Sequence, residues 1–155
     1  MDMGYLVPTL ALECVPGDKF NISCESMVRL APMIAPIMHR VDVTMHYFFV
    51  PNRILWPNWE KFITNTPDEV TGILPALPTL SLNPGSPSDF VRLADYFGCC
   101  PPPTSGSTDA DISAFPFAAY QKIYDEYYRD QNLIPSTYRD LLDGDINNGF
   151  LAGVS

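Results

Sequence analysis

The sequence predicts a mainly β fold with inserted helices, in which the first two strands belong to opposite layers of a β-sandwich. Two stretches, residues 20–30 and 37–50, alternate between apolar and polar side chains with the period of two that is typical of half-buried strands. The connector between them contains Pro32 and Pro36 and is too long for a two-residue hairpin turn. The second strand is therefore free to lie in a different sheet, which is the arrangement of a sandwich.

The composition limits both the regularity of the fold and its partners. The chain has 155 residues, enough for one domain, and its 16 prolines interrupt nearly every apolar stretch, so we expect neither long helices nor wide regular sheets. Its 18 acidic and 9 basic residues give a net charge of -9, so we expect little direct binding to nucleic acid. No apolar run is long enough to span a membrane, and the first residues do not resemble a secretion signal, so we expect no membrane partner.

The first strand, residues 20–30, follows a turn at Pro16-Gly17-Asp18, because proline and glycine set the backbone angles that a tight turn needs. Residues 5–15, before the turn, are apolar and broken by Pro8, which favours an arm or an edge strand. The apolar face of the strand, interrupted only by a serine, consists of Phe20, Ile22, Cys24, Val28 and Leu30.

The second strand, residues 37–50, ends at Pro51, which has no backbone donor and restricts the residue before it. Asn52 is a residue type that starts turns, so we expect a change of direction here. A helix over residues 56–64 should follow, with Pro57 in its first turn. The apolar face of this helix would consist of Trp56, Trp59, Phe62 and Ile63.

Two further helices are predicted, over residues 87–97 and 116–131, with loop insertions at residues 65–86 and 98–115. The helix over residues 87–97 has a serine N-cap before it and a glycine after it. The helix over residues 116–131 is the stronger prediction, because aromatic residues recur in it at spacings of three and four, which is typical of a core or an interface. These aromatic residues are Phe117, Tyr120, Tyr124, Tyr127 and Tyr128.

The residues that most often carry chemistry do not form a recognisable site. His39 and His46 are seven apart in the second predicted strand, so they point to opposite faces and cannot bind one metal ion together. Residues 143–154 begin like a calcium loop, but the glycine is one position late and Val154 replaces the glutamate ligand. The carboxylates of the 116–131 helix lie beside basic residues, which favours ion pairs over a catalytic dyad. We therefore predict no catalytic, metal-binding or cofactor-binding residue and no enzyme activity.

The four cysteines give no metal-binding pattern. Cys14, Cys24, Cys99 and Cys100 lack the C-x-x-C spacing of a zinc site, and adjacent cysteines rarely form a disulfide with each other without strain. We expect free thiols in a reducing compartment. The sequence assigns no role to the pair at positions 99 and 100, nor to the mostly polar residues 136–155.

Four blocks of sequence carry a resemblance to a known family. They are Pro16-Gly17-Asp18, residues 31–38 (APMIAPIM), residues 48–64 (FFVPNRILWPNWEKFIT) and residues 115–133 (FPFAAYQKIYDEYYRDQNL). With these blocks in this order, over most of residues 5–133, the chain resembles the major capsid protein of the Microviridae, small tailless single-stranded DNA phages, and in particular its gokushovirus-like branch.

The resemblance implies a viral jelly-roll β-sandwich of eight strands, in which residues 1–155 are the N-terminal part of a single capsid domain and the later strands follow Ser155. It implies a structural coat subunit that self-assembles into a T=1 icosahedral virion around single-stranded DNA, in the cytoplasm of a bacterial host. The implied partners are identical subunits, a small DNA-condensing protein and a pilot protein, without a cofactor.

We predict that ten residues of the third and fourth blocks make contacts in the subunit core or between subunits, and the sequence leaves open which of the two each one makes. They are Pro51, Asn52, Arg53, Trp56, Trp59, Phe62, Tyr120, Tyr124, Tyr127 and Tyr128.

Two other classes of protein remain as alternatives. A carbohydrate-binding β-sandwich would share the strands and the aromatic residues, but it is normally secreted and carries calcium or disulfides. A cupin-type jelly-roll enzyme needs two or three histidines that converge on a metal ion, which His39 and His46 do not supply.

Overall fold

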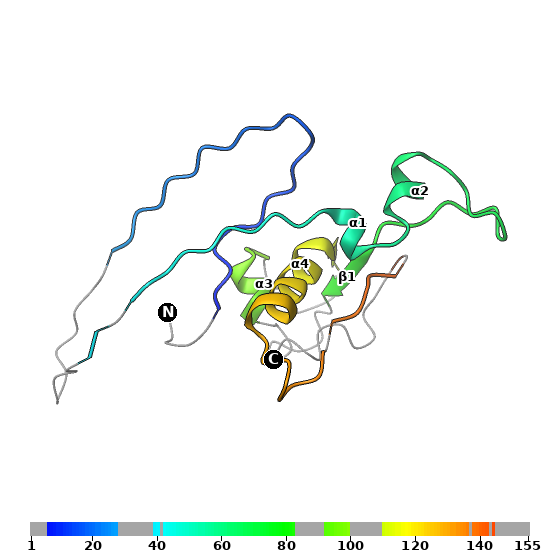
Figure 1. The fold of residues 1–155 in the computed structure, drawn as a ribbon. Helices are drawn as coiled ribbons and strands as arrows, with labels where there is room; N and C mark the ends of the chain where they lie inside the picture. Colours follow the sequence, from blue (N-terminus) through cyan, green and yellow to red (C-terminus); the bar gives the residue numbers. More distant parts are fainter. Residues whose placement is uncertain are drawn as a thin grey trace, which may run out of the picture. The chain divides into compact units, whose positions relative to one another are not determined.

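A computed structural model describes residues 6–27, 39–40, 42–82, 92–99, 110–136, 138–142 and 144 (Figure 1). The chain divides into two units, each described below by itself. Unit 1 comprises Met1–Ala11 and Phe48–Ser155, and unit 2 comprises Leu12–Tyr47. Among the described residues, none of the helices combines the length and the hydrophobicity that crossing a membrane requires.

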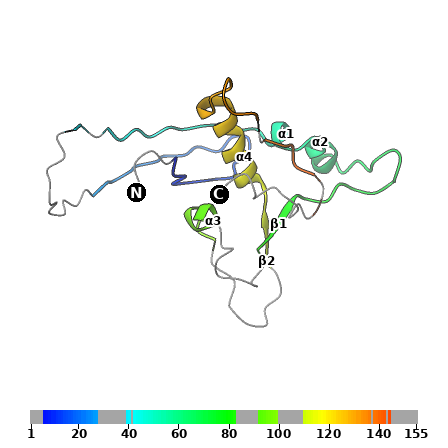
Figure 2. The same ribbon diagram turned by 90° about the horizontal axis from the view of Figure 1, so that it is seen from below.

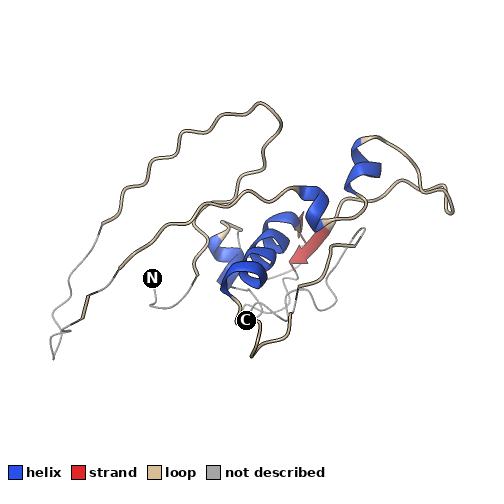
Figure 3. Ribbon diagram, in the orientation of Figure 1, coloured by secondary structure: helices blue, strands red, loops and turns tan. Residues whose placement is uncertain are grey.

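Unit 2 is extended chain in its described residues, with the predicted turn near its start. The amide of Asp18 donates to the carbonyl of Val15 at 3.1 Å, and its carboxylate accepts from the amide of Val15 at 2.9 Å. Gly17 has a φ of 98°, a conformation that favours glycine, so the turn forms for the reason that the sequence predicts. Figure 3 shows the described part of unit 2 as loop throughout.

The two predicted strands are not paired in the described residues. No ladder is assigned in residues 20–27 or 42–50, and residues 28–38 and 41 lie outside the described part. A strand needs a hydrogen-bonded neighbour, which alternation alone does not supply. Among the described residues of both stretches, the apolar side chains are exposed except that of Val50, which is half-buried, so the alternation is present but nothing covers the apolar rows. The exposed side chains include Phe20, Ile22, Val43, Met45 and Tyr47.

The ladder in the described residues joins β1, Thr79–Leu82, to β2, Ala110–Ser113, as an antiparallel pair. Figure 2 shows the two strands side by side. Thr79 is paired with Ser113 in this register. Both strands lie inside the predicted loop insertions, residues 65–86 and 98–115, so that prediction was wrong at these positions. Four residues are too few to show a period of two, and a partner some thirty positions away leaves no local signal.

The helix predicted over residues 56–64 is replaced by two shorter helices. Helix α1 covers Asn52–Leu55 and helix α2 covers Trp59–Ile63. Trp56 lies between them in an extended conformation, with φ −134° and ψ 114°. The ring of a proline disfavours the helical region for the residue before it, so Pro57 separates the helices instead of starting one.

The remaining helices differ from the predictions at their ends. Helix α3 is described over Arg92–Tyr96, and the N-terminal half of the predicted 87–97 helix lies outside the described residues. Helix α4 covers Phe115–Ile123 and continues as a π-helical turn, η2, over Tyr124–Tyr128. The chain becomes extended at Arg129, two residues before the predicted end, after the Arg129 amide has donated to the Tyr124 carbonyl at 2.9 Å.

The core of unit 1 lies between α1, α3, α4 and β1. Residues 138–142, for which no element is predicted, close this core, because the Leu141 amide donates to the Leu55 carbonyl at 2.9 Å. The Thr79 amide in β1 donates to the Gly144 carbonyl at 3.0 Å. The buried apolar residues are Leu55, Trp56, Leu80, Leu93, Ala94, Ala114, Phe115, Phe117, Ala118 and Leu141.

Candidate functional site

The ten predicted contact residues fall into three groups in the structure, and the first is an aromatic cluster around Trp56. The Trp56 side chain is 0% exposed, its ring centroid lies 5.5 Å from that of Phe62 and 6.0 Å from that of Phe115. Trp59 is half-buried and packs edge-on against Phe115 at 5.7 Å. Trp56 is therefore a core residue, whereas Trp59 and the exposed Phe62 complete the outer side of the same cluster.

The second group, Pro51, Asn52 and Arg53, starts helix α1 and so positions Trp56. The Ile54 amide donates to the Pro51 carbonyl at 3.0 Å, and the Trp56 amide donates to the Asn52 carbonyl at 2.9 Å. Pro51 and Asn52 are half-buried, and Arg53 is exposed. Arg53 is therefore the member of this group whose side chain is accessible to solvent.

The third group is the four tyrosines of α4 and η2. Tyr120 is half-buried, and its hydroxyl donates to the Leu6 carbonyl at 2.8 Å. Burial, and to a smaller extent the neighbouring Tyr124, raise the pKa of Tyr120, so the hydroxyl keeps its proton as a donor. Tyr127 is 70% exposed, and its ring lies 5.1 Å from that of Phe48. Tyr128 is half-buried, with its ring 6.3 Å from that of Phe48.

The charged residues of α4 and η2 pair with one another. Asp125 and Arg129 have side chains that are each 12% exposed, and the Arg129 Nε lies 2.7 Å from the Asp125 Oδ1. Neither atom makes a hydrogen bond of acceptable geometry, so the contact is an ion pair with poor alignment. Lys122 pairs with Glu126 at 2.8 Å, and its Nζ also lies 4.8 Å from the ring centre of Tyr138. These carboxylates form ion pairs, as the sequence predicts.

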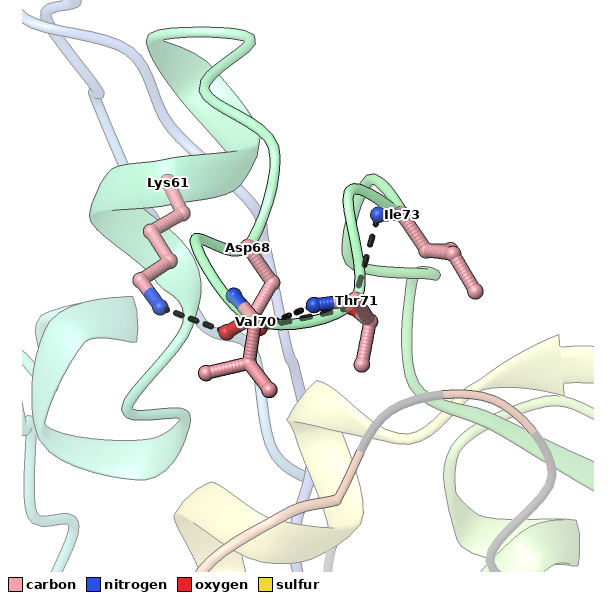
Figure 4. A network of polar contacts seen from close by, with 5 residues as sticks. All are labelled: Lys61, Asp68, Val70, Thr71 and Ile73. Atoms are coloured by element: carbon pink, nitrogen blue, oxygen red, sulfur yellow. Dashed lines mark hydrogen bonds and ion pairs between the residues drawn. The ribbon is translucent and has the colours of Figure 1, made fainter.

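Sequence reasoning missed a polar network in the loop after α2, which Figure 4 shows. The Asp68 Oδ1 accepts from the Val70 amide at 2.9 Å and from the Thr71 amide at 3.1 Å, while the Oδ2 accepts from the Lys61 Nζ at 3.0 Å. The Thr71 hydroxyl donates to the Asp68 Oδ1 at 3.3 Å, and the Ile73 amide donates to the Thr71 hydroxyl at 3.4 Å. The Asp after a proline was the available signal, since aspartate commonly bonds the backbone two residues on.

The donors around Asp68 hold its pKa at about 2, mainly through the hydrogen bond from Lys61 and then through the two backbone amides. Beside it lies an open hollow of about 310 Å³, lined by Asn58, Asp68, Thr71, Ile73, Leu74 and Pro75. Both oxygens of the carboxylate already accept hydrogen bonds from the chain, so the network orders this loop.

Within the described part of the chain, no group of three or more His, Cys, Asp and Glu residues could hold a metal ion. Cys14 and Cys24 are exposed, Cys99 is half-buried, and none of the three forms a disulfide. Cys100 and most of the calcium-like segment, residues 143–154, lie outside the described residues.

Comparison with known proteins supplies the remaining information. A protein family described as Capsid protein (F protein) matches residues 1–149 of the chain. Proteins called Capsid protein VP1 are 40% identical over 138 residues in Chlamydia phage 1, 37% identical over 131 residues in Bdellovibrio phage phiMH2K and 31% identical over 134 residues in Spiroplasma virus 4. The matches cover 83–85% of the chain and 22–23% of the relatives, so the chain spans less than a quarter of the length of the curated relatives it matches.

Proposed function

The chain belongs to the bacteriophage capsid protein (F protein) family, and on that premise we propose that it is part of a coat subunit that assembles with identical copies into a small T=1 icosahedral virion around single-stranded DNA. We propose that the coat role is structural and that the chain has no enzyme activity. Because the chain belongs to a capsid protein family, we prefer the coat role to the two alternatives, the carbohydrate-binding module and the cupin-type enzyme.

The observation that carries the proposal is the exposed apolar side of the extended segments in unit 2. Val43, Met45 and Tyr47 alternate along one segment and are all exposed, as are Phe20 and Ile22 along the other. Exposed apolar rows of this kind are stabilised when strands of another segment or another molecule cover them. We therefore assign these segments to two strands of a jelly roll, whose other strands belong to coat sequence that this chain does not contain.

We use the burial of the predicted contact residues to propose which of them serve the subunit core and which contact other subunits. Trp56 is fully buried, so we assign it to the subunit core, together with the half-buried Pro51 and Asn52 at the start of α1. Arg53, Phe62, Tyr124 and Tyr127 are exposed, so we assign them to contacts between subunits.

The charge of the chain supports the proposed partners. With 18 acidic and 9 basic residues, this part of the coat protein repels phosphate, so we assign neutralisation of the DNA charge to other parts of the virion, among them a small basic DNA-condensing protein. A pilot protein completes the proposed set, with assembly in the cytoplasm of the host bacterium.

The test is to express the complete reading frame that encodes this chain in bacteria, with and without the other virion proteins, and to ask whether its product assembles. Electron microscopy and sedimentation should show closed particles of one diameter, and the particles should protect single-stranded DNA from nuclease. Soluble monomers alone, with the other virion proteins present, would contradict the proposal. Particles that protect only double-stranded DNA would contradict the assignment of the genome.

A further inference from the structure

Helix α4 and the π-turn η2 contact the two stretches of unit 1 that come directly before and directly after unit 2 in the sequence. The first part of unit 1 runs to Ala11, and its second part begins at Phe48. We call residues 6–11 the first root, and Phe48 the second root, of the intervening segment Leu12–Tyr47. At the first root, the Tyr120 hydroxyl donates to the Leu6 carbonyl across 114 positions of sequence. At the second root, the Phe48 ring packs against Tyr127 and Tyr128.

The first contact is made by a donor that the core holds in place. The Tyr120 ring packs edge-on against Phe97 at 6.5 Å, and Phe97 packs against the buried Phe117 at 5.0 Å. Ala11 lines a small hollow together with Phe97 and Phe117, so the chain from Leu6 to Ala11 follows the same side of unit 1. The hydrogen bond is therefore one of two contacts that place this root.

The second contact depends on the π-turn. Tyr127 and Tyr128 are neighbours in sequence, and both rings lie within 6.3 Å of the Phe48 ring, one tilted at 45° and one edge-on at 75°. The wider π-turn is closed by the bond from the Arg129 amide to the Tyr124 carbonyl. The Arg129 side chain stabilises it through the ion pair with Asp125 and a hydrogen bond to the Ile134 carbonyl. Such turns inside α-helices are rare and often mark functional positions.

We propose that α4 and η2 form a two-ended clamp, in which Tyr120 holds the root at Leu6–Ala11 and the pair Tyr127 and Tyr128 holds the root at Phe48. These tyrosines are positioning residues, because they set where the segment leaves unit 1 and where it returns. Holding both ends of a segment reduces the volume that it can reach, which raises the effective concentration of its exposed apolar rows for a partner strand. The clamp is a property of the chain alone and does not depend on whether particles form.

The two ends of the clamp use different chemistry, so each can be opened separately in the full chain. Tyr120→Phe removes the hydrogen bond and keeps the ring, and Tyr124→Phe is the matched control, since the Tyr124 hydroxyl takes no part in either contact. Chymotrypsin cleavage, mapped by mass spectrometry, should become about fivefold faster at Leu6 and Leu10 in Tyr120→Phe, as expected for the loss of one hydrogen bond. Cleavage at Phe48 and Phe49 should not change.

Opening the other end should give the reverse pattern. Tyr127→Ala should accelerate cleavage at Phe48 and Phe49 by about threefold or more and leave Leu6 and Leu10 unchanged, with Tyr124→Ala as the control for loss of a ring from the same turn. Cleavage after the buried Phe117, measured in the same digest, reports unfolding. If the chain is cleaved faster after Phe117 in Tyr127→Ala, the comparison is made with Tyr127→Leu, which keeps apolar bulk.

The clamp is overturned if Tyr120→Phe and Tyr124→Phe give the same cleavage rates at Leu6 and Leu10. It is also overturned if either folded variant accelerates cleavage at both roots equally, because the two contacts would then not act on separate ends.

Discussion

Trp56 is fully buried and yet stands in an extended conformation between two helices, and both properties follow from its neighbours. Pro57 excludes the helical conformation at Trp56, which turns the side chain out of the helix direction. The ring then enters the space beside Phe115, at the start of α4. The sequence predicts Trp56 on the apolar face of one helix, whereas in the structure Trp56 lies in the connection between helices α1 and α2.

The difference in burial between the two tryptophans predicts different energetic roles. Trp56→Ala should lower the free energy of unfolding of the chain by about 3 to 5 kcal/mol, because a fully buried aromatic side chain is removed and leaves a cavity. Trp59→Ala should cost less than half as much, since Trp59 is half-buried and its site is open to water. Urea unfolding followed by circular dichroism measures both, and equal losses would show that the helix α2 side of the cluster is as closed as the α1 side.

The lowered pKa of Asp68 predicts that the loop after α2 becomes less ordered in acid. Its pKa is lowered from 3.8 to about 2, so its contribution to stability is complete above its ordinary pKa and is lost as the pH falls towards 2. Titration of the carboxylate by NMR should show this lowered pKa. Proteolysis between Pro67 and Leu74 should accelerate as the pH falls from about 4 to about 2.

The matched variants separate this network from a general effect of acid. Asp68→Asn should accelerate cleavage of the loop already at neutral pH, because the ion pair with Lys61 is lost. Glu69→Gln removes the adjacent charge, which makes none of the bonds in Figure 4, and should leave the cleavage rate unchanged. Equal effects of the two variants would show that the bonds to Asp68 do not order the loop.

At the scale of elements, local signals were sufficient where a residue acts on its own neighbours. The turn at Gly17 and the change from extended chain to helix after Pro51 follow from glycine and proline geometry. The aromatic spacing located α4, but the switch to the π-turn at Tyr124 depends on bonds made by Arg129 and was not visible in the spacing. The pairing of β1 with β2 depends on contacts between distant residues, which no single sequence displays.

The segment at residues 138–144 illustrates the same limit. Leu141 and Leu142 are adjacent and chemically identical, yet Leu141 is 1% exposed and Leu142 is 71% exposed. The Leu141 amide bonds to the Leu55 carbonyl at the end of α1, and this tertiary bond decides which leucine turns inwards. From the sequence alone, this segment is predicted only as mostly polar chain without a defined element.

This pair of leucines provides a prediction with its own control. Leu141→Ala should lower the free energy of unfolding by about 2 to 4 kcal/mol through loss of buried surface and the cavity left against α1. Leu142→Ala should change it by less than about 0.5 kcal/mol, as is usual for exposed positions. Thermal or urea unfolding of the two variants measures the difference, and similar values would show that the segment is not docked.

At the scale of the whole molecule, the two units differ in what they bury. Unit 1 encloses an apolar core with Trp56 and Phe117 fully covered. Among the described residues of unit 2, the large apolar side chains are exposed. The sequence could predict which residues alternate along these segments and that the family is a capsid family. It could not divide the ten contact residues between core and surface, because burial at Trp56 and exposure at Tyr127 depend on how distant segments pack.

The exposed row of unit 2 therefore serves assembly in the proposed coat role, and charge placed on it separates assembly from folding. Val43→Asp combined with Met45→Asp should change the free energy of unfolding of the chain by less than about 0.5 kcal/mol, because Val43 is 73% exposed, Met45 is 46% exposed and neither belongs to the buried core. The same change in the complete coat protein should reduce the yield of particles by at least about tenfold, since two unpaired charges would be buried against a partner strand. Thr44→Asp places one charge on the opposite side of the segment and should reduce the yield far less. Equal particle yields from Thr44→Asp and from the double variant would show that the alternating row remains in water after assembly, and the strand assignment for residues 42–47 would then have to be abandoned.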